Sequence, residues 1–108
     1  MSGDLVPATR NWSAAEVAGI GEDVDAWYLR VSGEVELGNE NERPHLTMSE
    51  PPSSKLDVLS LDLVVSTDGD SVFRMRWASF EWRHRTFPGA YAGVRVMWQG
   101  VEVASLQL

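Results

Sequence analysis

The chain contains no cysteine. This excludes disulfide bonds, thiol catalysis and thiolate metal sites, and it fits a reducing compartment. No apolar run approaches the roughly 18 residues that a membrane-spanning helix needs. The N-terminus also lacks the basic region followed by an apolar one that a secretory signal would show. We therefore expect a cytoplasmic protein without membrane contact, and an extracytoplasmic one only if a leader has been trimmed from the chain.

Catalytic and ligand-binding motifs are equally scarce. Two histidines, His45 and His84, are too few for a three-ligand zinc site unless a carboxylate joins them. No Gly-x-Ser-x-Gly elbow for a serine nucleophile occurs, and Gly19-Ile-Gly21 is too short for a phosphate-binding loop. We expect no metal, no cofactor and no catalysis. A small enzyme stays open as an alternative, and it would hold one of the histidines against a carboxylate in a deep pocket.

Positive charge is in short supply, with nine basic against sixteen acidic residues and a net charge of −7. From Glu16 to Glu50, nine acidic residues face only two arginines, whereas Phe73 to Phe87 holds four arginines against Glu81. The overall negative charge opposes non-specific attraction to nucleic acid, so we expect no nucleic-acid partner. The acidic part and the basic stretch would also allow two copies to associate by charge complementarity.

The sequence does contain stretches in which apolar and polar residues alternate with a period of two. From Trp27 to Leu37 every odd position is apolar or, at Gly33, small, and the even positions from Arg30 onward are polar. This pattern predicts a β-strand with one face on a core. Two more stretches repeat it: Leu56 to Val65, and Tyr91 to Leu106 as a hairpin.

The predicted partner of the second strand is the segment that follows it. A three-residue loop at Asp68-Gly69-Asp70 would keep apolar residues on one face, because a one-residue slip inverts every side chain. At Ala78-Ser79 the apolar positions change phase, which predicts a β-bulge. The predicted pairs across this loop are Val65 with Phe73, Leu63 with Met75 and Leu61 with Trp77. In the last hairpin, a two-residue loop at Gln99-Gly100 is predicted to pair the apolar face of one strand (Val94, Val96 and Trp98) with that of the next (Val101, Val103 and Ser105).

Residues 1–25 form the least regular part of the sequence. Ser13 to Glu16 has the form of a capping box, but the glycines that soon follow leave room for one or two helical turns at most. Leu5 and Val6 could alternatively form a short edge strand ended by Pro7. We expect an irregular segment with one short helix or one edge strand.

These patterns together predict an all-β protein. The expected fold is one domain, residues 1–108, built as a β-sandwich of six to seven antiparallel strands of immunoglobulin-like type. A small β-barrel is the alternative. The cysteine pair of immunoglobulin domains is absent, so the expectation concerns architecture and not family membership.

The best candidate for function is Phe73 to Tyr91, where arginines alternate with aromatic residues. Arginine beside aromatic residues is the composition of protein-binding hot spots. The competing interpretation is that the aromatic side chains fill the core and the arginines form the solvated face. The phase change would aim Trp82 and His84 away from the core, where Trp82 could stack on a sugar ring or a partner side chain. The four other tryptophans (Trp12, Trp27, Trp77 and Trp98) are expected in the core. The candidate binding residues are Arg74, Arg76, Trp82, Arg83, His84, Arg85 and Tyr91.

We therefore expect a non-catalytic binding module that contacts a protein partner through the arginine and aromatic surface or through a sheet edge. The alternatives are a self-associating structural domain, a small enzyme or a carbohydrate-binding domain. The sequence identifies neither the partner nor the process.

Overall fold

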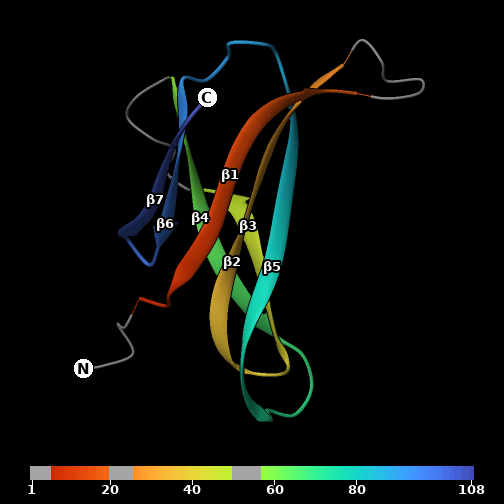
Figure 1. The fold of residues 1–108 in the computed structure, drawn as a ribbon, viewed down its shortest axis with the longest axis vertical. Coiled ribbons are helices and arrows are strands. Elements are labelled where there is room, and N and C mark those ends of the chain that lie inside the picture. The colour runs from red at the N-terminus through yellow and green to blue at the C-terminus, as the bar shows by residue number, and fades with distance from the viewer. Residues whose placement is uncertain (1–5, 20–25, 50–56) are drawn as a thin grey trace.

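The computed structural model describes residues 6–19, 26–49 and 57–108, and these ranges hold seven β-strands and no helix (Figure 1). The all-β prediction is therefore confirmed. One sheet has the order β1 (Thr9–Ala18), β2 (Trp27–Asn39), β5 (Phe73–Thr86). The other has the order β3 (Glu42–Met48), β4 (Val58–Thr67), β6 (Gly93–Trp98), β7 (Val101–Gln107). Nothing in these ranges forms a helix that could cross a membrane.

Both sheets contribute to one hydrophobic core. The odd-numbered residues of β2 from Leu29 to Leu37 are buried in it, as the alternation predicts, whereas Trp27 is 37% exposed at the start of the strand. In β4 the odd positions from Leu59 to Leu63 are buried in the same way. The core residues are Leu29, Val31, Val35, Leu37, Leu46, Leu59, Leu61, Leu63, Ala78, Phe80, Val94 and Val96.

The predicted pairing of β4 with β5 is wrong. β4 pairs with β3 and β6, whereas β5 lies in the other sheet and pairs with β2. Alternation shows which side chains face the core but not which strand lies alongside, so it cannot tell a hairpin from a crossing between sheets. The turn after β4 is anchored at that crossing, since the Asn41 backbone C=O accepts from the Asp68 N–H (3.1 Å) and the Asn41 side chain donates to the Gly69 C=O (3.1 Å).

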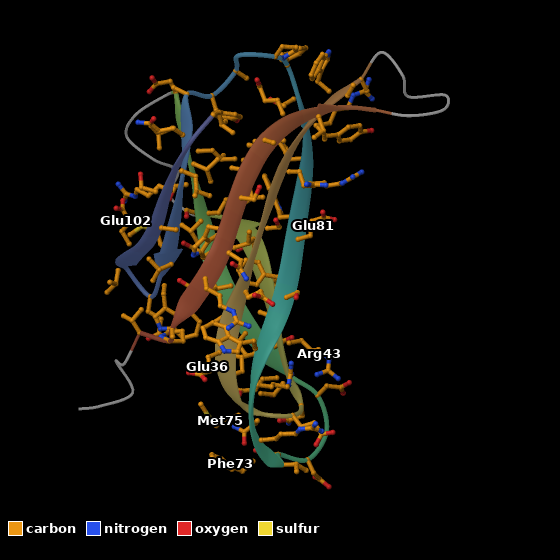
Figure 2. All side chains as sticks on the ribbon, viewed as in Figure 1. Glu36, Arg43, Phe73, Met75, Glu81 and Glu102 are labelled. Atoms are coloured by element: carbon orange, nitrogen blue, oxygen red, sulfur yellow. The ribbon has the colours of Figure 1, made fainter. Side chains whose placement is uncertain are left out.

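The predicted bulge at Ala78-Ser79 is also absent. The β2–β5 ladder runs without a break from Leu37 opposite Arg76 to Trp27 opposite Thr86, and its irregularity lies between Leu37 and Asn39. The phase change was predicted because Phe73 and Met75 were assigned to the core. They instead occupy the far tip of β5 (Figure 2), where their side chains are 79% and 54% exposed.

The strands are not all antiparallel, which corrects another expectation. β6 runs parallel to β4, from Val58 opposite Gly93 to Asp62 opposite Met97. The chain leaves this sheet after β4, passes through β5 in the other sheet and then returns. β5 is the one strand between β4 and β6 in the chain, and it runs opposite to β4. The next strand, β6, therefore runs in the same direction as β4.

The β6–β7 hairpin is confirmed, with a correction to its register. Gln99 and Gly100 form the two-residue loop, and both have positive φ, 47° and 84°, as in a type I′ turn. Trp98 lies opposite Val101 as predicted. A bulge between Val96 and Met97 then shifts the remaining pairs, so that Val96 lies opposite Ala104 and Val94 opposite Leu106.

Residues 9–18 form the ten-residue strand β1, in place of an irregular segment or a short helix. Ser13 to Glu16 lies inside this strand, because pairing with β2 outweighs a local capping signal. β1 is an edge strand, but it follows Pro7 rather than preceding it, and Val6 lies outside any strand. Leu5 is outside the described residues.

Candidate binding face on the three-stranded sheet

The face of the β1–β2–β5 sheet that points away from the core is here called the outer face. Its charge changes along the strands, from an acidic end through a middle of small polar residues to a basic end. Glu36 and Glu81 mark two levels of this face in Figure 2. The β2–β5 pairs that form it are Glu36–Trp77, Glu34–Ser79, Ser32–Glu81, Arg30–Arg83 and Tyr28–Arg85.

A bulge in β1 builds the middle of this face. Arg10 lies opposite Glu34 and Ser13 opposite Ser32, so that Asn11 and Trp12 together face a single β2 residue. Asn11 has a φ of 57°, a left-handed conformation that asparagine tolerates better than most residues. Without the extra residue, Trp12 would lie opposite Ser32 and point to solvent. With it, the Trp12 ring packs on the core.

Gly33 makes room for that ring. A Cβ at Gly33 would lie 3.0 Å from Trp12 Cε3 and 3.1 Å from Phe80 Cζ. The two rings contact each other edge to face, with centroids 5.2 Å apart. The glycine in the middle of the central strand therefore marks a close approach of two aromatic rings.

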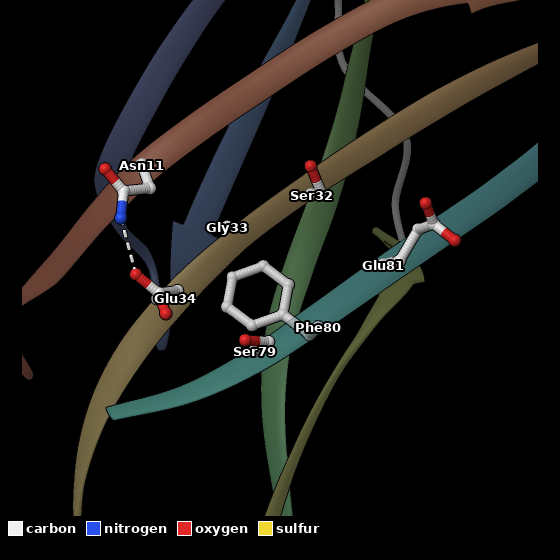
Figure 3. A pocket seen from close by; sticks show the side chains of 7 residues that line it. All are labelled: Asn11, Ser32, Gly33, Glu34, Ser79, Phe80 and Glu81. Atoms are coloured by element: carbon white, nitrogen blue, oxygen red, sulfur yellow. Dashed lines mark hydrogen bonds between the residues drawn. The ribbon is translucent and has the colours of Figure 1, made fainter. Parts of the chain in front are cut away.

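The bulge also directs two donors onto one carboxylate. Asn11 Nδ2 and Arg10 Nε donate to the same oxygen, Glu34 Oε1, at 2.5 and 2.9 Å. Figure 3 shows the hydrogen bond from Asn11. The hydrogen bond from Asn11, and after it that from Arg10, lowers the pKa of Glu34 below its ordinary value. The Arg10 guanidinium also lies over the Trp77 ring, 3.9 Å from its centroid, in a cation–π contact.

A shallow hollow of about 520 Å³ lies over the middle of the outer face. Most of its lining residues carry a hydroxyl, amide or carboxylate group. Its lining residues, shown in Figure 3, are Asn11, Ser32, Gly33, Glu34, Ser79, Phe80 and Glu81.

The basic end of the outer face consists of Tyr28, Arg30, Arg83 and Arg85. Arg30 and Arg83 are direct cross-strand neighbours, and Arg85 is the neighbour of Tyr28. Like charges placed directly opposite in a sheet repel each other. One ion pair in the described residues offsets this repulsion, between Arg30 Nε and Glu81 Oε2 at 3.6 Å, and both side chains are about half exposed.

The structure separates the predicted site residues into three places. Arg83 and Arg85 lie together at the basic end. Trp82 and His84 lie on the opposite, inner face of β5, stacked on each other with ring centroids 5.3 Å apart. Trp82 packs against the core, as does Tyr91, so the expectation that Trp82 points away from the core is wrong.

Arg74 and Arg76 lie at the other end of β5. Arg74 is mostly exposed, with Nη1 4.0 Å from Glu40 Oε1. Arg76 is half-buried and donates to the backbone carbonyls of Glu40, at 3.1 Å, and Glu42. Arg76 therefore ties β5 to the β2–β3 connection, and both arginines lie at the opposite end of β5 from the basic end.

Sequence reasoning did not find the residues that complete the face. The rhythm of β2 did put Arg30, Ser32 and Glu34 on one solvated side, but it could not show that β5 lies beside them. The β1 bulge that brings Arg10 and Asn11 onto Glu34 has no local sequence signal that we recognise.

Within the described ranges no cluster of three or more His, Asp or Glu residues could hold a metal ion. No known protein family, no curated protein and no solved structure matches the chain.

Proposed function

We propose that the protein is a non-catalytic binding module, and that the basic end of the outer face binds an acidic segment of a protein partner. The observation that carries the proposal is the cross-strand pair Arg30–Arg83, with Arg85 beside it. Among the described residues, the ion pair at these three guanidinium groups is the one between Arg30 and Glu81, and this leaves donors of Arg83 and Arg85 for an external anion.

The energetics favour an external carboxylate. Directly opposed like charges cost up to about 1 kcal/mol in a sheet, and the half-exposed Arg30–Glu81 pair recovers at most about the same amount. A partner carboxylate between Arg30 and Arg83 would relieve the repulsion and could accept two parallel hydrogen bonds from one guanidinium. Tyr28, beside Arg85, adds an aromatic surface of the kind found in protein interfaces.

A short acidic peptide fits this surface better than a nucleic acid. The net charge of −7 repels a long polyanion at a distance, whereas a few carboxylates feel mainly the local arginines. Neither His45 nor His84 lines the hollow on the outer face or the one beside Trp98, which supports a module rather than an enzyme. Two sheets around one core support an immunoglobulin-like sandwich as the proposed architecture. A cytoplasmic location stays a prediction.

Titration of a fluorescently labelled hexaglutamate peptide tests this proposal. We expect the double variant Arg83→Gln/Arg85→Gln to bind at least about tenfold more weakly than wild type at low salt. The matched control is Arg43→Gln/Arg74→Gln, which removes the same charge outside the basic end. Equal losses in both variants, or no binding by wild type, would contradict the proposal.

A second candidate function is self-association, because the outer face carries Glu34 and Glu36 at one end and the arginines at the other. Two copies packed face to face in opposite directions would bring opposite charges together. The sedimentation coefficient, measured over a range of concentrations, should then show a dimer that dissociates as salt is raised and that Arg83→Gln/Arg85→Gln abolishes. A monomer at every concentration and salt would exclude this candidate.

A further inference from the structure

In the part of the chain that the structure describes, β4 is paired with a strand on both sides only at Leu61 and Asp62, because β6 pairs with its residues 58–62 and β3 with its residues 61–67. β3 accompanies it up to Thr67, whereas the ladder with β6 ends at Asp62 opposite Met97. There the chain reverses at the Gln99-Gly100 turn and runs back as β7. Among the described residues, the second half of β4 has no strand on its β6 side.

The backbone groups that face this open side can be assigned. Ser60 C=O accepts from Ser49 N–H at 3.0 Å, and Asp68 N–H donates to Asn41 C=O at 3.1 Å, so the even-numbered residues face β3. The N–H and C=O groups of successive strand residues point to alternate sides. Val65 and Thr67 therefore direct theirs away from β3, to the side where β6 has ended.

A hollow of about 330 Å³ lies at this place. Trp98, which packs against the core, is the aromatic residue of the lining, and Asp62 is the charged one. The lining residues are Asp62, Leu63, Val64, Val65, Trp98, Gln99 and Gly100.

We propose that the second half of β4 binds an extended peptide segment of another protein as an added strand. Backbone donors and acceptors at two-residue intervals are matched by another strand, which is the basis of strand addition to sheet edges. The hollow beside Trp98 would take one apolar side chain of that segment. The carboxylate of Asp62 favours a lysine or arginine next to it, by charge complementarity.

This edge suits an added strand better than the edges at β5 and β3. The free edge of β5 carries alternating charged side chains such as Arg83 and Arg85, and β3 contains Pro44, features that discourage pairing. The inferred site lies on the other sheet from the basic end, so it is independent of the proposed function. It can hold or fail separately.

Selection of heptapeptides from a random phage-displayed library on the wild-type chain tests the inference. We expect the selected peptides to alternate an apolar residue with polar ones and to carry a basic residue. Only every second N–H group of the peptide donates to β4. N-methylation of that set should weaken binding about tenfold or more, whereas N-methylation of the other set should leave binding nearly unaffected. Asp62→Asn should weaken the binding of basic peptides several-fold and leave a peptide with the basic residue replaced by alanine unchanged.

Amide hydrogen exchange on the wild-type chain locates the bound peptide without any variant that could unfold. In the free protein the amides of Val65 and Thr67 should exchange quickly, whereas those of Val64 and Ser66 are protected by β3. The peptide should protect Val65 and Thr67. Failure to select any peptide, protection elsewhere with none at these two amides, or protection that rises with protein concentration alone and so indicates a second copy, would overturn the inference.

Discussion

Replacing Gly33 by alanine tests the packing at the centre of the fold. The added methyl group would meet Trp12 Cε3 at 3.0 Å and Phe80 Cζ at 3.1 Å, closer than side chains normally approach. Neither ring moves freely, because the rings pack against each other and Trp12 Nε1 donates to Thr9 Oγ1 at 3.0 Å. Relief of the contact therefore requires a shift of the β1 bulge or of Phe80.

Two opposing terms determine the size of the effect. Overpacking of a core costs about 1 to 3 kcal/mol, whereas the lower entropy of the unfolded chain returns about 0.4 to 1 kcal/mol when glycine becomes alanine. We therefore expect Gly33→Ala to lower the free energy of unfolding by about 1 to 2 kcal/mol. For a domain of this size this lowers Tm by roughly 4 to 8 °C per kcal/mol.

Urea and thermal unfolding, followed by tryptophan fluorescence, measure the change. Gly38→Ala is the matched control on the same strand, since a Cβ there would lie 3.6 Å from Met75 Sδ, an ordinary contact. It should leave stability unchanged or raise it slightly. In a Trp12→Leu background the Gly33→Ala penalty should become smaller, because the contact with the Trp12 ring is removed while the one with Phe80 remains. Equal stability of Gly33→Ala and Gly38→Ala would refute the reasoning.

Two further predictions concern stability. Gly93→Ala should cost at least about 2 kcal/mol in the same urea assay, because its Cβ would lie 2.9 Å from the backbone oxygen of Leu106 and a main chain yields less than a side chain; an unchanged midpoint would contradict this. Glu34 has a pKa lowered from its ordinary 4.5 by Asn11 and Arg10, so its stabilising effect is present above that pH and is lost as pH falls through the lower, folded-state value. The difference in unfolding midpoint between wild type and Glu34→Gln should accordingly shrink as pH falls from 5 towards 2. A difference that does not depend on pH would show that the ionised carboxylate adds nothing to the stability of the fold through these hydrogen bonds.

The sequence predicted the faces of the strands better than their neighbours. The rhythm of β2 and the Gln99-Gly100 turn depend on local geometry, namely side-chain alternation and positive φ, and both were correct. Strand partners depend on contacts between distant segments, and several pairings satisfy the same alternation. The pairing of β4 with β5 across the Asp68 to Asp70 turn was chemically consistent and still wrong.

The tryptophans illustrate the same limit. Trp12 and Trp98 pack against the core as expected, but Trp77 lies opposite Glu36 on the outer face, and Trp82 takes the inner position. The error has one cause, since the inferred phase change at Ala78-Ser79 reversed the faces of the first part of β5. A continuous ladder with β2 needs no such change.

The candidate site follows from the strand partner, and not from the arginine-rich segment by itself. Had β5 paired with β4 as predicted, Arg76 would lie opposite Asp62 and be neutralised, and Arg83 would have no arginine across from it. Pairing with β2 instead sets Arg83 against Arg30, two residues from separate stretches of the sequence. A repulsive cross-strand pair on an exposed face lowers stability, and Arg30→Gln should therefore leave the fold at least as stable as wild type while weakening the binding of hexaglutamate. A variant that loses stability and retains binding would show that these arginines support the sheet and do not form a recognition surface.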